Sequence, residues 1–423
     1  ELKRLLHYAW TRIPFYATLY DEAGFHPGHF RSMADLTRIP EVTKTMLRQA
    51  PRDDLAPRSQ RADQAEPNPV DWQHTHYLST SGSTGEPVGL YKTKDSMWMF
   101  MAAAFHCYQQ WCGDKPIQNV LYILDDKPGN IDYTLGDLLR TLSMEDRFVS
   151  SFSNVEAIWD ALDHFRPEYI STYPSVMRNL SLYILENRIA CPWVKLLNLT
   201  SEMLDSHTRH LIGQAFPAAR IVETYTSTEA GFMGYQCLDK GGFHLSEELG
   251  IYELHPVNNA IEDDQSEAEH MTHSRDNLHK VVVTDLTNFA TPLIRYSGLG
   301  DLVTPAVDKC QCGSRHQRIK SLQGRVVDSI KLPDGSRVTP YVLTNIVSDT
   351  PGIQKYQIIQ TTAQTFTVKV VTGPDAPSQA NLQTCIQAAF RKTLRNDAIC
   401  TIEPVDDIKP KPGQHKVPLV ISS

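Results

Sequence analysis

The sequence predicts an α/β protein made of two domains, and three observations carry that prediction. A chain of 423 residues is too long for one compact core. Between residues 120 and 222 short apolar strands alternate with helical stretches, which is typical of a parallel sheet covered by helices. Beyond Gly324 the pattern changes, and residues 366–371 show the two-residue alternation of a half-exposed sheet. We therefore expect a large N-terminal domain with mostly parallel sheets over residues 1–323, and a small α+β domain over residues 324–423.

The N-terminal domain is expected to begin with short helices and to continue into the sheet. Before Leu55, apolar residues at helical spacing are interrupted by Pro27, Pro40 and Pro51, which predicts short helices joined by turns. An apolar, aromatic-rich helix over residues 97–111 should pack on the sheet. The alternating elements that follow are strands at 120–124, 169–171, 196–199 and 219–222, with helices at 155–163, 176–186 and 206–216.

The remaining segments are a polar insertion and the small domain. Residues 258–275 are acidic and polar, and we expect an exposed loop there. For the small domain the sequence predicts a strand at 330–332, a turn at 333–335, helices at 341–347 and 381–394, and strands at 355–360, 365–371 and 399–403.

Composition excludes several classes of protein. A formal net charge of -8 and a pI near 6.1 argue against nucleic acid as a main partner, because binding to a phosphate backbone needs a basic surface. No apolar run approaches the roughly 18 residues of a membrane span, and the first residues lack the apolar stretch of a secretory signal. Eight scattered cysteines favour reduced thiols. We expect a cytoplasmic protein with no membrane partner.

Residues 77–87, Tyr-Leu-Ser-Thr-Ser-Gly-Ser-Thr-Gly-Glu-Pro, are the most informative stretch of the chain. Two glycines permit backbone conformations in which several N–H groups turn toward one anion. The hydroxyl groups among them add donors, as a nucleotide's phosphates require. The spacing and lysine of a Walker loop are missing, and a Ser/Gly-rich surface turn is the alternative. The residues of this predicted phosphate loop are Ser79, Thr80, Ser81, Gly82, Ser83, Thr84 and Gly85.

Further segments appear in an order that resembles the adenylate-forming enzymes, and most of all the phenylacetate–CoA ligase family. The resemblance covers nearly the whole chain, although Glu86 stands where the family's loop has lysine. Its fold, activity and site residues are therefore expected here, including a small domain that moves about a hinge. The matching segments are the phosphate loop, the helical lead-in at 5–44, Tyr225-Thr226-Ser227-Thr228-Glu229, Asp285-Leu286-Thr287, residues 291–296 with Gly300-Asp301, and Gly324-Arg325 with Asp328.

The resemblance implies a site for ATP and AMP with Mg²⁺. It places Tyr225 against the adenine, Asp301 on the ribose hydroxyls and Glu229 on the metal, with the Thr84 hydroxyl nearby. Arg325 is the second ribose or hinge residue. The alternatives are a core aromatic for Tyr225, a helix-start carboxylate for Glu229 and a solvated linker residue for Arg325. The other nucleotide contacts implied are Ser201, Glu202, Thr226, Ser227 and Thr228.

Several positions depart from the family pattern. Ser201 and Thr226 stand where the family has glycine, and Val327 stands where it has the hinge acid, so we expect the pivot within residues 325–328. Five residues lie between Arg295 and Asp301, whereas the family usually has four between the corresponding arginine and aspartate. The catalytic lysine near the C-terminus is expected at Lys416 when counted from the apolar end, whereas the glycine register gives Gln414; a flexible basic tail is the alternative.

Cys310-Gln311-Cys312 forms a tight thiolate pair, and Cys237 with His244 adds a second pair about 70 residues upstream. Three thiolates and one imidazole make a tetrahedral set that suits structural Zn²⁺, and family members resemble this pattern. Reduced, partly buried cysteines are the alternative interpretation.

The family's acid pocket begins at a segment matched here by Tyr173, Pro174 and Ser175, with Phe105, His106 and Tyr108 as further candidates for its wall. The resemblance predicts activation of a carboxylic acid, aromatic in most of the family, followed by transfer to coenzyme A, and a homodimer. A carrier-protein thiol, an amine or another small nucleophile could replace coenzyme A as acceptor. A nucleotide-binding relic without catalytic activity is the third hypothesis.

Overall fold

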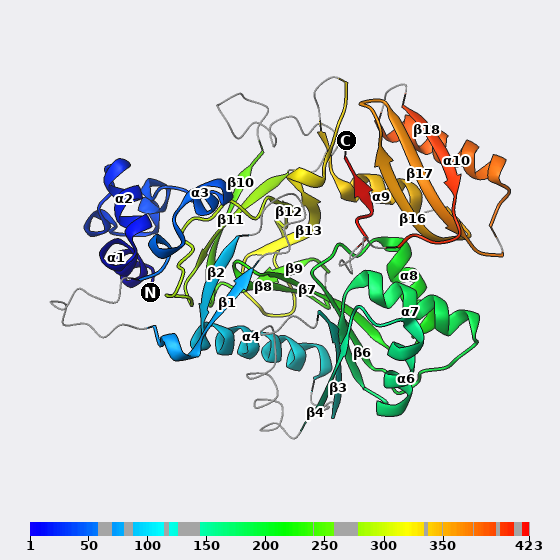
Figure 1. The fold of residues 1–423 in the computed structure, drawn as a ribbon, viewed down its shortest axis with the longest axis horizontal. Helices are drawn as coiled ribbons and strands as arrows, with labels where there is room; N and C mark the ends of the chain where they lie inside the picture. The colour runs from blue at the N-terminus through cyan, green and yellow to red at the C-terminus, as the bar shows by residue number, and fades with distance from the viewer. Residues whose placement is uncertain are drawn as a thin grey trace.

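The computed structural model describes twelve stretches of the chain: residues 1–57, 70–79, 88–113, 118–125, 144–239, 241–257, 278–333, 337–348, 350–374, 376–394, 398–409 and 417–422. The predicted exposed loop at 258–275 lies outside these stretches. An eleven-stranded mixed sheet forms the centre of the molecule, with the strand order β10-β11-β12-β13-β9-β8-β7-β6-β5-β3-β4 (Figure 1).

The α/β class is confirmed, and the predicted parallel strands form one half of this sheet. They are β3 (Asn119–Leu124), β5 (Tyr169–Thr172), β6 (Leu196–Thr200) and β7 (Arg220–Ser227). A further parallel strand, β4 (Glu145–Ser150), pairs with β3 at the edge and is not predicted from the sequence. The other half is antiparallel, and the sequence pattern does not predict it. It consists of β8 (Gly231–Gln236), β9 (Phe243–Leu245), β10 (Gly250–Pro256), β11 (His279–Asp285), β12 (Asp301–Pro305) and β13 (Arg318–Arg325).

Helices cover both faces of the parallel half. On one face lie α6 (Val155–Phe165), α7 (Pro174–Glu186) and α8 (Ser206–Ala215), which match the three predicted helices. Asn154 caps α6 and Asp205 caps α8, each accepting a hydrogen bond from a backbone N–H of the first turn. On the other face lies α4 (Lys94–Cys112), whose residues Cys107 and Trp111 share a core with β5, β6 and β7. The central strands β5 and β6 are therefore buried on both sides, as their apolar runs require, whereas the edge strand β4 is largely exposed.

The N-terminal segment packs on the antiparallel half. Helices α1 (Leu2–Arg12), α2 (Pro14–Glu22) and α3 (Lys44–Gln49) contribute to the same core as β10, β11 and β12. The lead-in ends at Val42, whose N–H donates to the carbonyl oxygen of Arg295 and whose carbonyl accepts from Ser297 N–H. A separate hairpin of β1 (Thr75–Ser79) and β2 (Gly89–Thr93) precedes α4.

The C-terminal part has a core of its own, formed by residues from Ile330 to Val420. Its four-stranded sheet has the order β18-β17-β16-β19 and carries α9 (Pro340–Ser348) and α10 (Gln379–Leu394) (Figure 1). The strands are β16 (Ile353–Gln360), β17 (Thr365–Thr372), β18 (Ile399–Pro404) and β19 (Val420–Ile421), and a short pair, β14 (Ile330–Lys331) and β15 (Arg337–Val338), begins the segment. The predicted helices and strands of this region agree with these within a few residues. The division at residue 324 stays a prediction.

The part built on the large sheet and the C-terminal part are in contact at α8 and β16. The imidazole ring of His207 lies edge-on to the ring of Tyr356, with 6.4 Å between the ring centroids. Burial lowers the pKa of His207, so this contact is made by a neutral imidazole. Of the helices in the described residues, none combines the length and the apolar content needed to cross a bilayer.

Candidate active site

The predicted site segments meet at one edge of the large sheet. Parallel strands end on the same side, so the residues that close β5, β6 and β7 become neighbours. Tyr173 follows β5, Ser201 follows β6, and Thr226 lies near the end of β7. The β1–β2 hairpin reaches the same place, because Leu78 and Lys92 line the cavity found there.

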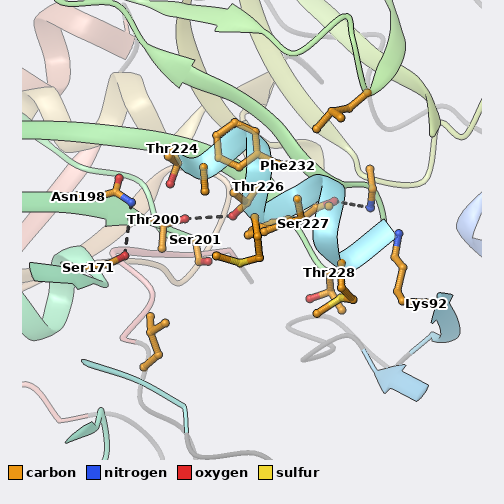
Figure 2. A pocket seen from close by; sticks show the side chains of 18 of the residues that line it. Lys92, Ser171, Asn198, Thr200, Ser201, Thr224, Thr226, Ser227, Thr228 and Phe232 are labelled. Atoms are coloured by element: carbon orange, nitrogen blue, oxygen red, sulfur yellow. Dashed lines mark hydrogen bonds between the residues drawn. The ribbon is translucent and has the colours of Figure 1, made fainter. Parts of the chain in front are cut away.

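That cavity has a volume of about 320 Å³, within the usual range for small-molecule sites, and Figure 2 shows part of its lining. Among the predicted site residues, those that line it are Tyr173, Ser201, Thr226, Ser227 and Thr228. The sheet supplies a polar floor, whereas α4 supplies an apolar wall of Met97, Phe100, Met101 and Ala104.

Two sets of residues predicted for the acid pocket do not line this cavity. Phe105, His106 and Tyr108 do not line the cavity, because α4 turns the face carrying residues 97, 100, 101 and 104 toward it. Pro174 and Ser175 do not line it either. The predicted nucleotide residue Glu202 accepts hydrogen bonds from Ser175 N–H (2.9 Å) and the Ser175 hydroxyl (3.0 Å), so this pair closes the first turn of α7.

Ser201 and Thr226, which replace family glycines, have different structural consequences. Ser201 has φ of +64°, a left-handed conformation that a glycine adopts without strain. Thr226 lies at an irregularity in the β7–β8 pairing, and its hydroxyl is 3.0 Å from that of Thr200. Figure 2 shows this pair of hydroxyls facing each other across the floor.

Tyr225, Asp301 and Arg325 come together although they lie on three different strands. Asp301 and Arg325 are directly opposite each other on β12 and β13. One carboxylate oxygen of Asp301 accepts from the Tyr225 hydroxyl (2.7 Å), and the other accepts from Arg325 Nε (3.3 Å). Burial raises the pKa of Asp301, and the Asp301 charge raises the pKa of Arg325. The structure therefore assembles the three residues that the sequence assigned to adenine, ribose and hinge.

Glu229 is buried and forms an ion pair with Lys44, whose Nζ lies 3.3 Å from Glu229 Oε1. Lys44 begins α3, so the N-terminal lead-in brings a cation to the carboxylate predicted to hold the metal. The sequence places Lys44 in a family-like segment but gives no sign of this contact, since 185 residues separate the two.

Lys92 is a second cation that sequence reasoning missed. Its Nζ lies 3.0 Å from Asp285 Oδ2, and both side chains are almost completely buried where they line the cavity. The other Asp285 oxygen accepts from Thr287 N–H and hydroxyl, at 2.9 Å and 2.7 Å. Asp285, matched to the ribose segment in sequence, is thus engaged in a structural network.

Arg295 is also structural. Its guanidinium makes a bidentate contact with Glu253 at 2.8 Å and 2.9 Å and donates to the Ile39 carbonyl oxygen. Between Arg295 and Asp301 the chain makes a turn at residues 298–299, and Gly300 after it has φ of +70°. Asp301 consequently reaches its partners in spite of the changed spacing.

The remaining predicted residues lie outside the described stretches. These are the loop residues Thr80, Ser81, Gly82, Ser83, Thr84 and Gly85, together with Gln414 and Lys416. Ser79 is described as the last residue of β1, paired opposite Gly89 of β2.

Cys237, His244, Cys310 and Cys312 form one cluster whose four ligand atoms all lie within 4.8 Å of one another. The sulfur atoms of Cys237 and Cys310 are 3.3 Å apart, as are the Cys312 sulfur and His244 Nε2. A tetrahedral Zn²⁺ with bonds of about 2.0–2.3 Å needs ligand atoms about 3.3–3.8 Å apart, so the donor set fits zinc with small adjustments. Burial lowers the pKa of His244, which favours the neutral imidazole that a metal binds.

Three similarities to known proteins bear on this arrangement. Residues 330–423 match the family described as the CapK C-terminal domain. Over 387 residues the chain is 26% identical to phenylacetate–coenzyme A ligase of Thermus thermophilus, covering 85% of this chain and 76% of that protein. The crystal structure of 2-hydroxyisobutyryl-CoA ligase in the postadenylation state with 2-HIB-AMP has a TM-score of 0.78 at 19% identity, covering 100% of this chain and 88% of that one.

The same ligase in its thioesterification state, with 2-HIB-AMP and CoA, gives a TM-score of 0.60 at 20% identity with the same coverage. The sequence and fold similarities agree with the order of motifs along the chain. The chain is therefore similar in sequence to a phenylacetate–coenzyme A ligase and shares its fold with a CoA ligase that forms an acyl-adenylate.

Proposed function

We propose that the protein uses ATP to activate a carboxylic acid as an acyl-adenylate and then transfers the acyl group to coenzyme A. The observation that carries this proposal is the assembly of Tyr225, Asp301 and Arg325 beside a cavity that the Thr226–Thr228 segment lines. In the first step a carboxylate oxygen bonds to the α-phosphorus and pyrophosphate leaves. In the second step the thiolate of coenzyme A bonds to the carbonyl carbon, and AMP leaves with that carboxylate oxygen.

Asp301 is the residue best placed to orient the nucleotide. A carboxylate has about four acceptor positions, and Tyr225 and Arg325 use two of them. The remaining positions match the two hydroxyls of a ribose. Arg325 keeps Asp301 charged against the effect of burial, so the aspartate binds as a strong acceptor.

The phosphate end of the site involves Glu229 and Lys44. Mg²⁺ takes one or two carboxylate contacts together with phosphate oxygens, and when bound it neutralises the charge on the leaving pyrophosphate. Glu229 would hold it, with Lys44 supplying positive charge beside the same carboxylate. The loop from Ser79 to Gly85 would hold the phosphates, and Lys416 the α-phosphate and carboxylate oxygens, as the family resemblance implies.

We propose an aryl acid as substrate. The cavity beyond the nucleotide segments is bounded by Phe100 and Phe232, and by the flexible side chains of Met97 and Met101. Such a wall accommodates a flat ring, since aromatic side chains and thioethers both contact ring faces and edges favourably.

The C-terminal part completes the proposal. We infer that it is a separate domain that pivots within residues 325–328, because Arg325 ends the large sheet and the second core begins at Ile330. The higher TM-score against the postadenylation form than against the thioesterification form supports an adenylating pose here.

Structural Zn²⁺ on Cys237, His244, Cys310 and Cys312 would tie the β8–β9 turn to the β12–β13 connection. Asp239 already bridges the same two segments, because its carboxylate accepts from Gln311 N–H at 3.1 Å. The homodimer that the resemblance implies stays a prediction, which size-exclusion chromatography with light scattering would test. The cytoplasmic location expected from the scattered cysteines also stays a prediction.

A two-part assay tests the function. Pyrophosphate release is measured with ATP, Mg²⁺ and a panel of aryl acids, and consumption of the coenzyme A thiol is measured in the same reactions. We expect both to depend on the acid. Pyrophosphate release without thiol consumption would point to another acceptor, and no release with any acid would leave a nucleotide-binding relic.

A further inference from the structure

The floor of the cavity carries polar side chains where a covered parallel sheet normally carries apolar ones. On β5, β6 and β7 the residues facing α4 alternate with residues facing the opposite core. Leu196 and Val222 on this face are apolar, as expected. The next inward-facing positions toward the carboxyl edge, however, are Ser171, Asn198 and Thr224, and all three line the cavity.

Asn198 is the least satisfied member of this row. The residue is 7% exposed, and Nδ2 donates to the Ser171 hydroxyl at a long 3.4 Å. Its carbonyl oxygen, Oδ1, has no hydrogen-bond partner among the residues that the structure describes. Figure 2 shows Asn198 and Ser171 side by side at the inner end of the floor, away from Ser227 and Lys92. A buried acceptor without a partner is unfavourable, so a bound molecule that donates to it gains affinity from that site.

The position of Asn198 fixes where such a donor must lie. Asn198 precedes Thr200 by two residues on the same strand face, a separation of about 6–7 Å along the strand. Thr200 and Ser201 line the cavity beside Thr226 of the predicted nucleotide segment, and we place the reacting carboxylate there. The far end of the substrate, about one ring away from its carboxylate, therefore meets the Asn198–Ser171 pair.

Tyr169 and Tyr122 also line the cavity at the end where Asn198 lies. These side chains do not favour a charged group on the substrate. Burial raises the pKa of Tyr169 to about 12, although Asn198 and Ser171 beside it oppose the rise, so its hydroxyl stays neutral. No lysine or arginine among the described residues lines the cavity except Lys92, which Asp285 already pairs. A neutral donor suits this surrounding, whereas a second carboxylate on the substrate would be buried without a partner.

We propose that Asn198 determines substrate specificity, and that the acid carries a neutral hydrogen-bond donor, a hydroxyl or an amino group on its ring, which donates to Asn198 Oδ1. The proposal rests on the proposed function for the place of the carboxylate. Ser171 positions the Asn198 amide by accepting from Nδ2, and α4 packs over the ring. A site built to pair with such a donor discriminates against an analogue that lacks it, because the acceptor then stays unpaired.

The test uses matched acids and matched variants in acid-dependent ATP–pyrophosphate exchange. Each ring position is sampled with a hydroxyl, an amino, a methyl and a methoxy group. Asn198→Leu removes the acceptor at similar volume, Ser171→Ala removes its support, and Asn187→Leu makes the same chemical change at an exposed position at the end of α7. We expect one ring position at which the substituent matters. There, in the wild-type protein and in Asn187→Leu, kcat/KM for the acid with a ring hydroxyl or a ring amino group should exceed kcat/KM for the methyl-substituted acid by about tenfold or more.

In Asn198→Leu that preference should disappear or reverse in favour of the methyl acid, and Ser171→Ala should reduce it. Equal rates for the hydroxyl and methyl members at every position would overturn the inference while leaving the proposed function intact, as would preference for the methoxy acid. Absence of exchange with every acid would overturn the proposed function and the inference with it. If Asn198→Leu does not fold, the wild-type ratio of kcat/KM between the hydroxyl and methyl acids still tests whether the cavity selects for a ring donor.

Discussion

Replacing Asp301 by asparagine is the perturbation that best separates a nucleotide-binding role from a structural one. The Asp301 carboxylate accepts from Tyr225 and Arg325, and its side chain is 13% exposed, whereas that of Arg325 is 42% exposed. An asparagine oxygen still accepts from Tyr225, and water reaches Arg325. Because burial raises the pKa of Asp301, the charged form is disfavoured by the fold, and removing the charge relieves that penalty. We expect the free energy of unfolding to change by less than about 1 kcal/mol.

The nucleotide should respond differently. Hydrogen bonds from ribose hydroxyls to a carboxylate contribute about 1.5–3 kcal/mol, and a neutral amide accepts them less strongly. The loss corresponds to roughly a 10- to 150-fold lower kcat/KM for ATP in the exchange assay. Asp21→Asn, the same change at an exposed position at the end of α2, should leave both quantities unchanged.

The assay pairs ATP–pyrophosphate exchange with thermal unfolding in the presence and absence of AMP. Asp301→Asn should keep the wild-type Tm without AMP and lose most of the rise in Tm that AMP produces. A variant with unchanged exchange kinetics would show that Asp301 does not bind the ribose. A variant whose Tm falls by many degrees along with its activity would show that Asp301 serves the fold instead.

Four further predictions concern the fold around the site. Lys92→Met leaves the buried Asp285 carboxylate without its cation, so denaturant unfolding should show a loss of about 3–5 kcal/mol. Ser201→Gly relieves a left-handed backbone and should stabilise the protein by about 0.5–1 kcal/mol, seen as a higher Tm. Cys310→Ser should lower both the zinc content, measured by elemental analysis, and the Tm. The folded-state pKa of His207 lies below its ordinary 6.5, so its stabilising contribution is present above pH 6.5 and is lost as pH falls below that value; His207→Gln should reduce this pH dependence of Tm.

Each of these predictions has a control and a contradicting result. Cys385→Ser changes an exposed cysteine outside the cluster and should leave zinc content unchanged; equal zinc in Cys310→Ser would remove the metal assignment. A Lys92→Met variant as stable as wild type would show that the buried pair contributes little. A lower Tm in Ser201→Gly would contradict the prediction of backbone strain at Ser201. A His207→Gln variant whose Tm has the wild-type pH dependence would contradict the predicted role of His207.

The sequence predicts four of the five parallel strands because buried strands appear as apolar runs such as 120–124 and 196–199. The fifth, β4, is a largely exposed edge strand without such a run, and the sequence does not predict it. The antiparallel half is harder to predict, since its members depend on distant pairings and some are very short. Phe243–Leu245, for example, has three residues and joins β8 to β13. Alternation alone does not reveal such a strand.

The candidate site also contains residues that the sequence nominates and contacts that it does not reveal. The order of motifs nominates Tyr225 and Asp301 in spite of the changed spacing before Asp301, and the structure brings the two side chains into contact. Lys44 and Lys92 escape prediction because a lysine's partner is defined only by tertiary contact. The contact between Glu202 and Ser175 at the start of α7 is also not visible in the sequence, so the nucleotide role of Glu202 stays a prediction.

Transfer of an oxygen isotope label tests the central claim most directly. The acid that gives the fastest exchange is prepared with a labelled carboxylate and incubated with the protein, ATP, Mg²⁺ and coenzyme A. An acyl-adenylate route predicts that AMP carries one labelled oxygen on its phosphorus, with unlabelled pyrophosphate and an acyl-CoA thioester as the other products. Unlabelled AMP, or formation of ADP with labelled phosphate, would contradict adenylate formation by this protein.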